Sequence, residues 1–504
     1  MVFLFALIGF GIQSNYGRIS GLINSMNLSE DVLNILGAVF VFAFYIIIFT
    51  VVFIVGMAGQ KIRDLQAVPL EMRSFELRGV VFGKAKLTHS RKKKIYIVKP
   101  EDVEGHALVV GGVGSGKTSC VAIPTLRAWN DSVFAIDIKG ELYAKTKSDR
   151  PNIKVFNPQN AKTYGYDPYV FLKTSHNPTQ ESRAIAQALI PLPHDVREPF
   201  WIKNAQNILT GAILHYFHEG LSFVETLKEI QSNSPQELIK IVSQSGNENA
   251  RLCAGSFVGM ADKTLSGIFS ELSTENLTIV TDYEIIRALS RKHVISPADL
   301  EYGWDIYINV PEHLLRQWKT LLTLIVNQFL NFFERRDESN SPPILFMLDE
   351  FPRLGKIPAI TDGLATLRSK NISICLIIQS LAQLDEIYGH NSRKVILDTC
   401  AYKAILGAKD ADTQEYFSRM AGTYEKIEVT ESESGIGGVN MSIGRRELER
   451  RIIKPHEFSN MADIVLFTPF DVTLTMPNKR SKKPDRFSAV FCHIDKLPYY
   501  LNEK

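Results

Sequence analysis

Two stretches of the sequence carry residues whose types and spacing suit chemistry on phosphate groups. The first, GGVGSGKT over residues 111–118, fits the spacing G-x-x-x-x-G-K-T. Glycines at this spacing let backbone N–H groups turn inward on an anion at a helix N-terminus. Lys117 would then reach the β- and γ-phosphates of a nucleotide, and the Thr118 hydroxyl would ligate Mg²⁺. The candidate nucleotide-binding residues are Gly111, Gly112, Val113, Gly114, Ser115, Gly116, Lys117, Thr118 and Ser119.

The second stretch, PPILFMLDEFPRLGKIP over residues 342–358, runs five apolar residues into two adjacent carboxylates, Asp349 and Glu350. An apolar run of this length predicts a buried strand, and burying an unpaired carboxylate is costly. With a phosphate loop in the same chain, we interpret Asp349 as a Mg²⁺ ligand beside Thr118. Glu350 is then free to orient or deprotonate the attacking water. The alternative is that both carboxylates cap the following helix or form ion pairs.

A glutamine and two arginines extend this candidate site. Gln379 ends the apolar run ISICLIIQ, at the strand edge where ligands of open parallel sheets bind. It can hydrogen-bond the γ-phosphate or the water, or simply bond to backbone. Arg368 and Arg393 are both candidates for an arginine that reaches into a neighbouring subunit's site, as ring-shaped ATPases use, or for surface arginines.

Two further stretches are weaker candidates. In DIKGELY, Asp137 and Lys139 come close to the phosphate loop if the sheet is ordered as expected, so a role in the site competes with a simple ion pair. In REPFWIKNAQ, aromatic residues such as Trp201 alternate with cations and could stack nucleic-acid bases. For the second stretch, packing within a helical core is the favoured interpretation.

The elements that must position these residues alternate along the chain. Strand-like runs at 106–112, 132–140, 305–311, 344–348, 371–380 and 402–408 are separated by helix-compatible segments. This alternation predicts an α/β fold with a mainly parallel central sheet. Residues 176–296 show helical periodicity throughout and predict an all-helical insertion. The nucleotide-binding domain then has two parts, 61–175 and 297–504, and residues 430–447 are predicted to form a mobile loop or irregular hairpin.

Composition bounds the class of protein. The 504 residues are 45% hydrophobic and 22% charged, which is typical of a globular chain of two or three domains. The net charge of +3 is too small to indicate nucleic-acid binding by itself. Basic runs at 91–94 and 479–483 are either solvated loops or local basic surfaces. Five cysteines without C-x-x-C spacing predict reduced packing thiols in a cytosolic domain rather than a disulfide or zinc framework.

The N-terminal part predicts a membrane anchor over residues 1–60. Residues 35–59 contain no charge and are long enough to span a bilayer. Lys61 and Arg63 follow directly, so the positive-inside bias places the rest of the chain in the cytoplasm. Residues 1–12 are apolar but short for a span, and are either a first transmembrane helix or an interfacial segment.

These motifs together resemble those of a known family. GGVGSGKT, AIDIKGELY, FMLDEFPRLGKIPAI and IIQSLAQL are similar to the coupling proteins of conjugative type IV secretion systems, the TraG/TraD family. The resemblance covers nearly the whole chain. It implies a RecA-like P-loop ATPase domain, an inserted helical domain and an N-terminal transmembrane anchor. It also implies an inner-membrane homo-hexamer that hydrolyses ATP with Mg²⁺, binds single-stranded DNA with its relaxase, and passes it to the secretion channel proteins.

The resemblance also implies roles for the candidate residues. It assigns nucleotide and Mg²⁺ binding to Lys117 and Thr118, metal binding and hydrolysis to Asp349 and Glu350, sensing to Gln379, and the trans-acting arginine to Arg368 rather than Arg393. Two features depart from the family pattern: the first membrane segment is shorter than in the usual two-helix anchor, and there is no long acidic C-terminal tail. We therefore expect partner recruitment to depend on the helical insertion. Two alternatives stay open: an ATPase that exports protein effectors without DNA, and a nucleotide-regulated receptor that only docks cargo.

Overall fold

The computed structural model describes residues 46, 48–53, 73–74, 78–84, 96–337, 341–433, 441–451, 453–460, 465–468 and 472–473. One compact unit contains residues 67–86 and 90–504, and a second contains residues 1–66 and 87–89. Of the predicted span at 35–59, only residues 46 and 48–53 are described, and they are helical. Among the described residues, no helix has the length and apolar character needed to cross a membrane. Residues 1–12 and the basic runs at 91–94 and 479–483 lie outside the described residues.

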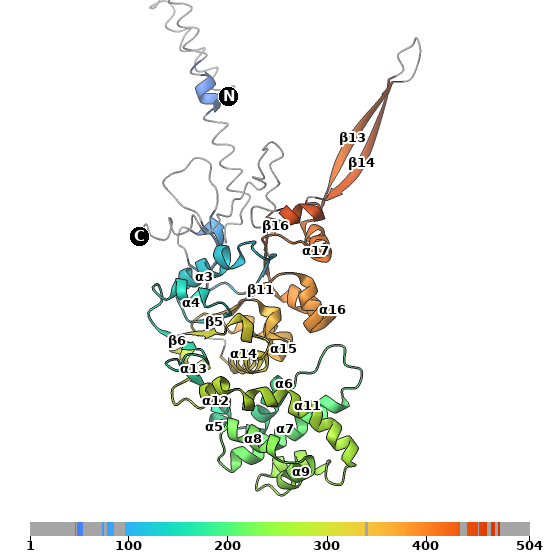
Figure 1. The fold of residues 1–504 in the computed structure, drawn as a ribbon. Coiled ribbons are helices and arrows are strands. Elements are labelled where there is room, and N and C mark those ends of the chain that lie inside the picture. Colours follow the sequence, from blue (N-terminus) through green and yellow to red (C-terminus); the bar gives the residue numbers. More distant parts are fainter. Residues whose placement is uncertain are drawn as a thin grey trace, which may run out of the picture. The chain divides into compact units, whose positions relative to one another are not determined.

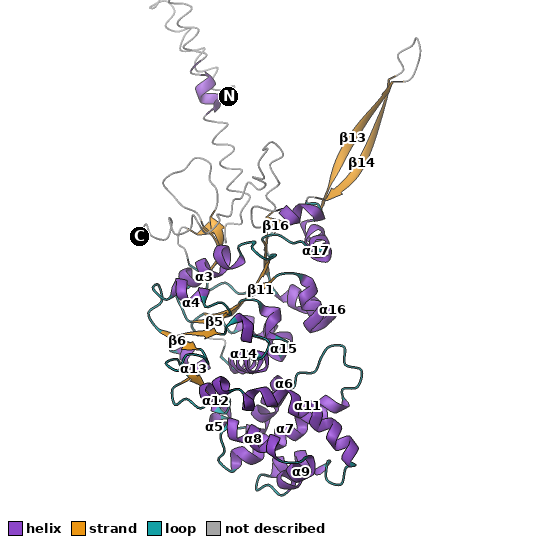
Figure 2. Cartoon of the chain, in the orientation of Figure 1, coloured by secondary structure: helices purple, strands orange, loops and turns teal. Residues whose placement is uncertain are grey.

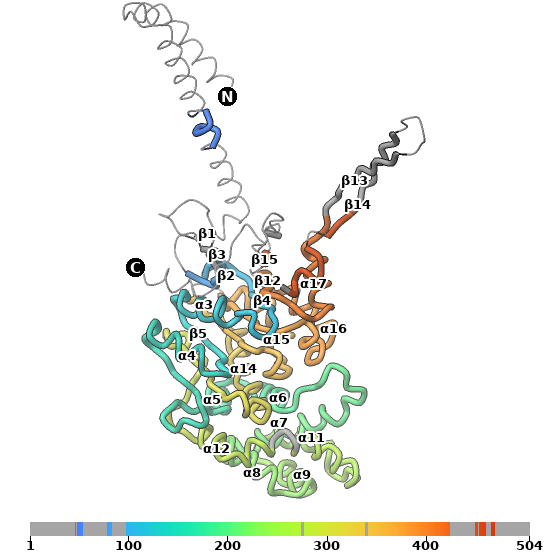
Figure 3. Tube along the Cα trace, turned by 45° about the horizontal axis from the view of Figure 1, so that its top comes forward, coloured from blue at the N-terminus to red at the C-terminus, as the bar shows by residue number. Residues whose placement is uncertain are grey.

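The core of the larger unit is a nine-stranded sheet with the order β16-β15-β12-β4-β11-β10-β5-β9-β6. Seven neighbouring strands, from β12 to β6, are parallel, and β15 and β16 add an antiparallel edge beside β12. Figure 3 shows β15, β12 and β4 next to one another. The bounds are β4 (Ala107–Val110), β5 (Val133–Asp137), β6 (Ile153–Phe156), β9 (Asp305–Asn309), β10 (Ile344–Leu348), β11 (Ile372–Ile378), β12 (Tyr402–Ile405), β15 (Val465–Phe467) and β16 (Val472–Thr473). The predicted mainly parallel sheet is confirmed.

Alternation of side chains along these strands builds two hydrophobic layers, one on each face of the sheet. In β10, Phe346 and Leu348 belong to one core cluster, whereas Leu345 and Met347 belong to the other. The strand is buried on both faces, which explains its unbroken apolar sequence. Residues of α14–α17 cover the first face and residues of η2, α3 and α4 cover the second, so the fold has three layers.

Helices supply the outer layers and a separate helical group. The helices that pack on the sheet are η2 (Thr118–Ala122), α3 (Ile123–Ala128), α4 (Glu141–Thr146), α13 (Pro297–Glu301), η3 (Glu312–Leu314), α14 (Lys319–Glu334), η4 (Phe351–Leu354), α15 (Pro358–Ser369), α16 (Leu381–Thr399), α17 (Ala411–Ala421) and η5 (Pro455–Asn460). Between β7 and β8 the described elements are helices only: α5 (Val170–Thr174), α6 (Pro178–Leu189), α7 (Phe200–His218), α8 (Phe223–Ser232), α9 (Pro235–Ser243), α10 (Glu248–Gly255), α11 (Asp262–Thr281) and α12 (Tyr283–Leu289). Figures 1 and 2 show α6–α9, α11 and α12 gathered together, α10 packs on α7 and α9, and α6 packs on α14.

Three small sheets complete the described structure. Strands β1 (Arg73–Ser74), β2 (Val80–Lys84) and β3 (Tyr96–Lys99) form an antiparallel sheet in the order β1-β3-β2. The short parallel pair β7 (Gly165–Tyr166) and β8 (Val294–Ile295) lies at the base of the helical group. The third is the hairpin of β13 (Thr423–Glu433) and β14 (Met441–Arg451).

The hairpin corrects one prediction. The Gly/Ser-rich composition of residues 430–447 predicts a mobile loop or an irregular hairpin. Residues 430–433 and 441–447 instead belong to β13 and β14, which pair in unbroken register over 11 residues each, and residues 434–440 lie outside the described residues. Glycine and serine weaken a strand without preventing its pairing. Among the described residues no disulfide forms: Cys120, Cys253, Cys375 and Cys400 are thiols, and Cys492 lies outside the described residues.

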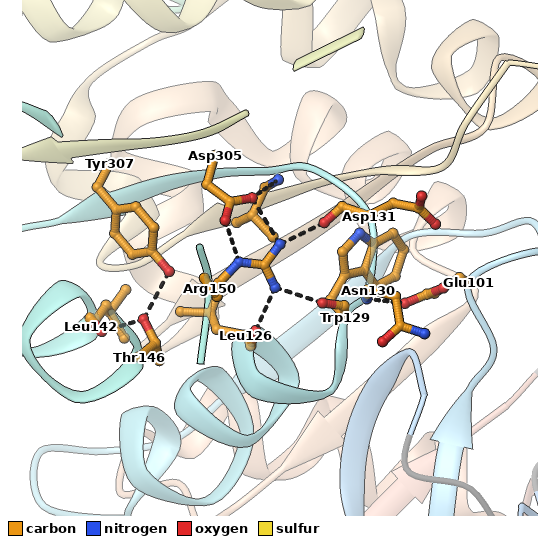
Figure 4. Close-up of polar contacts among 11 residues, drawn as sticks. Glu101, Leu126, Trp129, Asn130, Asp131, Leu142, Thr146, Arg150, Asp305 and Tyr307 are labelled. Carbon is orange, nitrogen blue, oxygen red and sulfur yellow. Dashed lines mark hydrogen bonds and ion pairs between the residues drawn. The ribbon is translucent and has the colours of Figure 1, made fainter. Parts of the chain in front are cut away.

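A buried arginine joins the helical layer to the amino ends of the strands (Figure 4). Arg150 donates to both carboxylate oxygens of Asp305, at 2.5 and 2.7 Å. Its remaining N–H groups donate to the carbonyl oxygens of Leu126 and Trp129, at the end of α3, and of Asp131. Every guanidinium donor therefore has an acceptor, which a buried charge requires.

Candidate nucleotide-binding site

The glycine-rich loop leaves the carboxyl end of β4 and enters η2. Gly114 and Gly116 have φ angles of +74° and +89°, a region that residues with a side chain rarely adopt. The N–H of Gly111 donates to the carbonyl oxygen of Ile378 at 3.1 Å, which fixes the start of the loop to the end of β11. The loop is therefore held between the parallel strands, in the strand–loop–helix context that its motif requires.

Lys117 and Ser115 show that the loop fits a phosphate group. Nζ of Lys117 donates to the carbonyl oxygens of Gly111 at 2.6 Å and Gly112 at 3.1 Å, so the lysine folds back over its own loop. Oγ of Ser115 is buried without a hydrogen-bond partner among the described residues. Burial lowers the pKa of Lys117, and Glu350 and Asp349 oppose this effect. A phosphate would supply acceptors to both side chains and offset the desolvated ammonium group.

Asp349 and Glu350 follow β10 directly. Asp349 is 9% exposed, and burial together with the charge of Glu350 raises its pKa to about 6. Helix α15 begins at Pro358 without a side-chain cap, so neither carboxylate caps it. Among the described residues, neither carboxylate forms an ion pair. A buried carboxylate whose pKa stays raised despite the nearby charge of Lys117, and that has no ion-pair partner among the described residues, is suited to a divalent metal, which would stabilise its charged form.

Glu350 and Gln379 are joined at the carboxyl ends of neighbouring strands. Nε2 of Gln379 donates to Oε2 of Glu350 at 2.9 Å, so the amide bonds to the acid rather than to backbone. Glu350 has a φ of +51°, in the left-handed region that residues with a side chain adopt mainly where the surrounding structure demands it. This turn aims the carboxylate back toward β11. The contact links the candidate base and the candidate sensor within one subunit.

Gln383 is a site residue that sequence reasoning missed. Its Oε1 accepts the backbone N–H of Gln379 at 3.1 Å, from the first turn of α16. It therefore fixes the backbone that carries the Gln379 amide. The only signal in the sequence was its position four residues after Gln379. That spacing indicates a contact only once it is known that α16 begins between the two residues.

Neither candidate arginine lies in the site of its own subunit. Arg368 is in the last turn of α15, and its Nε lies 3.2 Å from Oε2 of Glu104, which precedes β4. It is therefore at the amino ends of the strands, about 20 Å along β11 from Gln379, at about 3.3 Å per residue. Arg393 is largely buried and pairs with Asp385 on its own helix at 2.6 Å. Both arginines are in ion pairs, but the Arg368 side chain is 54% exposed in its pair, whereas Arg393 is largely buried in its own.

Asp137 and Lys139 do not form the ion pair considered for them. The carboxylate of Asp137 accepts the backbone N–H of Tyr143 at 2.8 Å. It is buried, which raises its pKa, while the backbone N–H groups at the start of α4 oppose this effect. Lys139 is exposed. Asp137 therefore anchors the start of α4, and the lysine is left for another partner.

The aromatic stretch before and within α7 is used in packing. The ring of Trp201 lies against Gly267 of α11, where an added Cβ would come within 2.7 Å of it. Its Nε1 donates to Oε2 of Glu198 at 3.2 Å. Phe200 makes an edge contact with Trp201 and stays 48% exposed. Packing between α7 and α11, the favoured interpretation, accounts for Trp201.

Comparison with known proteins identifies the family. Residues 59–470 match the family model described as "Type IV secretory system Conjugative DNA transfer". The chain belongs to this family. Within the conjugative DNA transfer family, VirD4 of Rhizobium radiobacter is 27% identical over 381 residues, which are 72% of this chain and 54% of the relative. The conjugal transfer protein TraG of the same organism is 25% identical over 377 residues, 71% of this chain and 58% of the relative. The chain thus spans little more than half the length of these relatives.

Solved structures of the coupling protein TrwB share the fold. The unbound form, TrwBdeltaN70, matches with a TM-score of 0.61 and 18% identity over 79% of this chain and 86% of that one. TrwB in complex with ADP and Mg²⁺ matches with the same TM-score and 18% identity over 83% of this chain and 93% of that one. The predicted RecA-like α/β fold and the predicted resemblance to type IV coupling proteins are confirmed.

Proposed function

We propose that the chain is a coupling ATPase of a type IV secretion system, which moves single-stranded DNA with its bound relaxase toward the secretion channel. The observation that supports an ATPase most directly is the meeting of Lys117, Asp349, Glu350 and Gln379 at the carboxyl ends of three adjacent strands. Ligands of open α/β sheets bind at this edge. The family assignment supports the coupling role.

The substrate is ATP and the metal is Mg²⁺. The loop from Gly111 to Ser119 surrounds the phosphates, and Lys117 exchanges its own loop carbonyls for β- and γ-phosphate oxygens. Thr118 and Asp349 would hold Mg²⁺, and the metal would offset negative charge on the phosphates. The ADP and Mg²⁺ complex of TrwB, which shares this fold, supports both assignments.

Glu350 and Gln379 then position the attacking water. The water oxygen forms a bond to the γ-phosphorus as the bond from that phosphorus to the β–γ bridging oxygen breaks. ADP leaves with the electron pair, and the carboxylate of Glu350 takes the proton from the water. Gln379, which already donates to Glu350, orients this carboxylate and passes the change in phosphate contacts to α16 through Gln383.

We place the protein at the inner membrane as a homo-hexamer, with Arg368 reaching the site of the neighbouring subunit. Three observations support this assembly: the charge-free run at 35–59, the exposure of Arg368, and its distance from the site of its own subunit. A site completed by a neighbour is active only in the assembled ring.

The test is ATP hydrolysis by the full-length protein in detergent, measured against protein concentration with and without single-stranded DNA. We expect turnover to rise steeply with concentration and with DNA, and to vanish in Lys117→Ala. Glu350→Gln should lower kcat about 100-fold or more while keeping nucleotide binding, because general base catalysis contributes that much. Glu248→Gln, at an exposed position in α10, is the matched control and should keep its activity.

Each other outcome selects a different function. Turnover that ignores DNA but responds to protein cargo would indicate an exporter of protein effectors. Nucleotide binding without turnover at any concentration would indicate a receptor that only docks cargo. Failure to bind ATP at all would overturn the proposed function.

A further inference from the structure

Lys139 lies in the loop that follows β5, two residues beyond the end of that strand, and β5 is the neighbour of β10, the strand that leads into the candidate metal ligand. Strand β5 pairs with β10, and Ile136 is the register partner of Leu348. The next residues, Asp137 and Asp349, therefore lie opposite each other on neighbouring strands, which are about 4.8 Å apart. The presence of Asp137 helps to raise the pKa of Asp349, in agreement with this placement. The loop that begins at Asp137 and carries Lys139 thus borders the acidic side of the nucleotide site.

The loop around Lys139 is held in a fixed shape. The Asp137 carboxylate accepts the N–H of Tyr143 and is also bonded to backbone groups from Gly140 to Leu142. Gly140 has a φ of +70°, and the side-chain amide of Asn309 lies 3.1 Å from where its Cβ would be. The sharp turn and the bonded carboxylate leave little freedom to the backbone of Lys139. The side chain alone has room to move.

Lys139 itself has no bound partner. Its side chain is exposed and forms no hydrogen bond or ion pair with any residue that the structure describes. Its charge is close enough to Lys117 to oppose protonation there, and close enough to Glu312 to favour ionisation of that acid. Glu312, however, is already held by Arg353 at 2.8 Å. Lys117 and Lys139 repel each other beside the phosphate loop, and an anion that lies between them would offset this repulsion.

We propose that Lys139 is a second lysine of the nucleotide site and contacts the γ-phosphate from the β5 side, opposite Lys117. The inference deepens the proposed ATPase function and rests on it. Lys139 donates hydrogen bonds to γ-phosphate oxygens, where charge builds up during transfer. Because ADP lacks this group, the contact makes the site prefer a triphosphate to a diphosphate.

The test compares two ligands on the full-length protein: ADP and a non-hydrolysable ATP analogue, each with Mg²⁺. Lys139→Gln should weaken binding of the analogue about tenfold, the effect of one charged hydrogen bond, while ADP binding changes less than about twofold. kcat should fall by about tenfold or more. Lys139→Arg keeps the charge and should restore analogue binding to within about threefold of the wild type. Lys145→Gln removes an exposed lysine of α4 that pairs with Glu141, and it should leave both ligands unaffected.

Three results would overturn the proposal. If Lys139→Gln weakened the binding of ADP and of the analogue equally, Lys139 would act only through its general charge and not on the γ-phosphate. Unchanged binding of both would make it a solvated lysine. If Glu312→Gln reproduced the effect of Lys139→Gln, the lysine would act through that acid instead. In each of these results the wild type still binds and hydrolyses ATP, so failure of the inference is distinct from failure of the ATPase function.

Discussion

At the scale of single residues, the site is defined by buried side chains whose charged or polar groups lack suitable partners. Lys117 donates only to carbonyls of its own loop, Ser115 has a buried hydroxyl without a partner among the described residues, and Asp349 has a raised pKa. Such groups destabilise a fold unless a ligand compensates them. Because three such groups lie together at one edge of the sheet, this edge is a candidate binding site rather than ordinary core packing.

His106 makes the stability of the fold depend on pH. Its Nε2 bonds to the carbonyl oxygen of Leu364 at 2.6 Å and its Nδ1 accepts the N–H of Ile374 at 3.2 Å, so the buried ring is neutral. Burial, with Lys99 and Arg368, lowers its pKa to about 4, from about 6.5 in the unfolded chain. Between these values the unfolded chain binds a proton that the folded chain excludes. Stability is therefore lost as pH falls from about 6.5 to about 4.

The corresponding variant is His106→Gln, which cannot be protonated. It should cost stability at pH 7.5, but that cost should shrink by about 2 to 3 kcal/mol by pH 4.5, at about 1.4 kcal/mol per pKa unit. Urea unfolding followed by tryptophan fluorescence at several pH values measures this difference. A constant gap between variant and wild type would contradict the assignment.

At the scale of elements, Arg150 shows how the layers are joined. Met in its place removes the ion pair with Asp305 and leaves the carbonyl oxygens at the end of α3 without their donor. An unpaired buried carboxylate costs about 3 to 5 kcal/mol, so Arg150→Met should lower the free energy of unfolding by that amount. Urea denaturation measures it.

Two further variants serve as controls for Arg150→Met. Arg127→Met breaks a partly exposed ion pair with Asp149 on the same side of the sheet and should cost less than about 1 kcal/mol. Arg150→Met combined with Asp305→Asn should recover part of the loss, because no buried charge is then left alone. A loss in Arg150→Met no greater than in Arg127→Met would show that the buried network contributes little.

The sequence predicted the elements better than the contacts between them. The apolar run before Asp349 and the glycine spacing of the phosphate loop are local signals, and both predicted the strands and the loop correctly. The pairing of Arg150 with Asp305 joins residues 155 positions apart, and the left-handed turn at Glu350 depends on its surroundings. Neither leaves a pattern in the chain. A hairpin was one of two alternatives predicted for residues 430–447, but its regular pairing was not, because composition alone understates pairing along a register.

At the scale of the whole molecule, the site is connected to the helical group. Nζ of Lys356, just after η4, donates to the carbonyl oxygen of Leu192 at 2.7 Å. His194 packs against Gly389, where α16 has a non-helical kink. Both contacts line or border a cavity of about 760 Å³ between the helical group and the elements that follow Glu350 and Gln379. The segments that follow Glu350 and Gln379 therefore contact the same loop of the helical group, at residues 192–194 between α6 and α7.

Assembly gives the prediction at this scale. If Arg368 acts on a neighbour, Lys117→Ala and Arg368→Ala should each be inactive alone, yet mixing them should restore turnover. About one quarter of the interfaces in a random equimolar ring join an intact phosphate loop to an intact arginine, so about a quarter of wild-type activity is expected. ATP hydrolysis after mixing and reassembly measures it.

The control uses the other arginine. Arg393 is bound to Asp385 within its own helix, so mixing Arg393→Ala with Lys117→Ala should give activity that only averages the two parents. Absence of recovery in the first mixture, under conditions where rings form, would remove Arg368 from the site.

The strand order has a consequence for how the chain is made. Strand β4, which carries the phosphate loop, has β11 and β12 as its two neighbours, and both are more than 260 positions further along the chain. A ribosome working at about 5 to 20 residues per second needs roughly 13 to 50 seconds to reach them. For most of that time the nascent loop has neither its neighbouring strands nor the acids Asp349 and Glu350, so nucleotide cannot serve as a template for early folding. A stalled or truncated product that ends before β10 carries the complete glycine motif but lacks both acids and both neighbours of β4, and we expect it not to bind ATP.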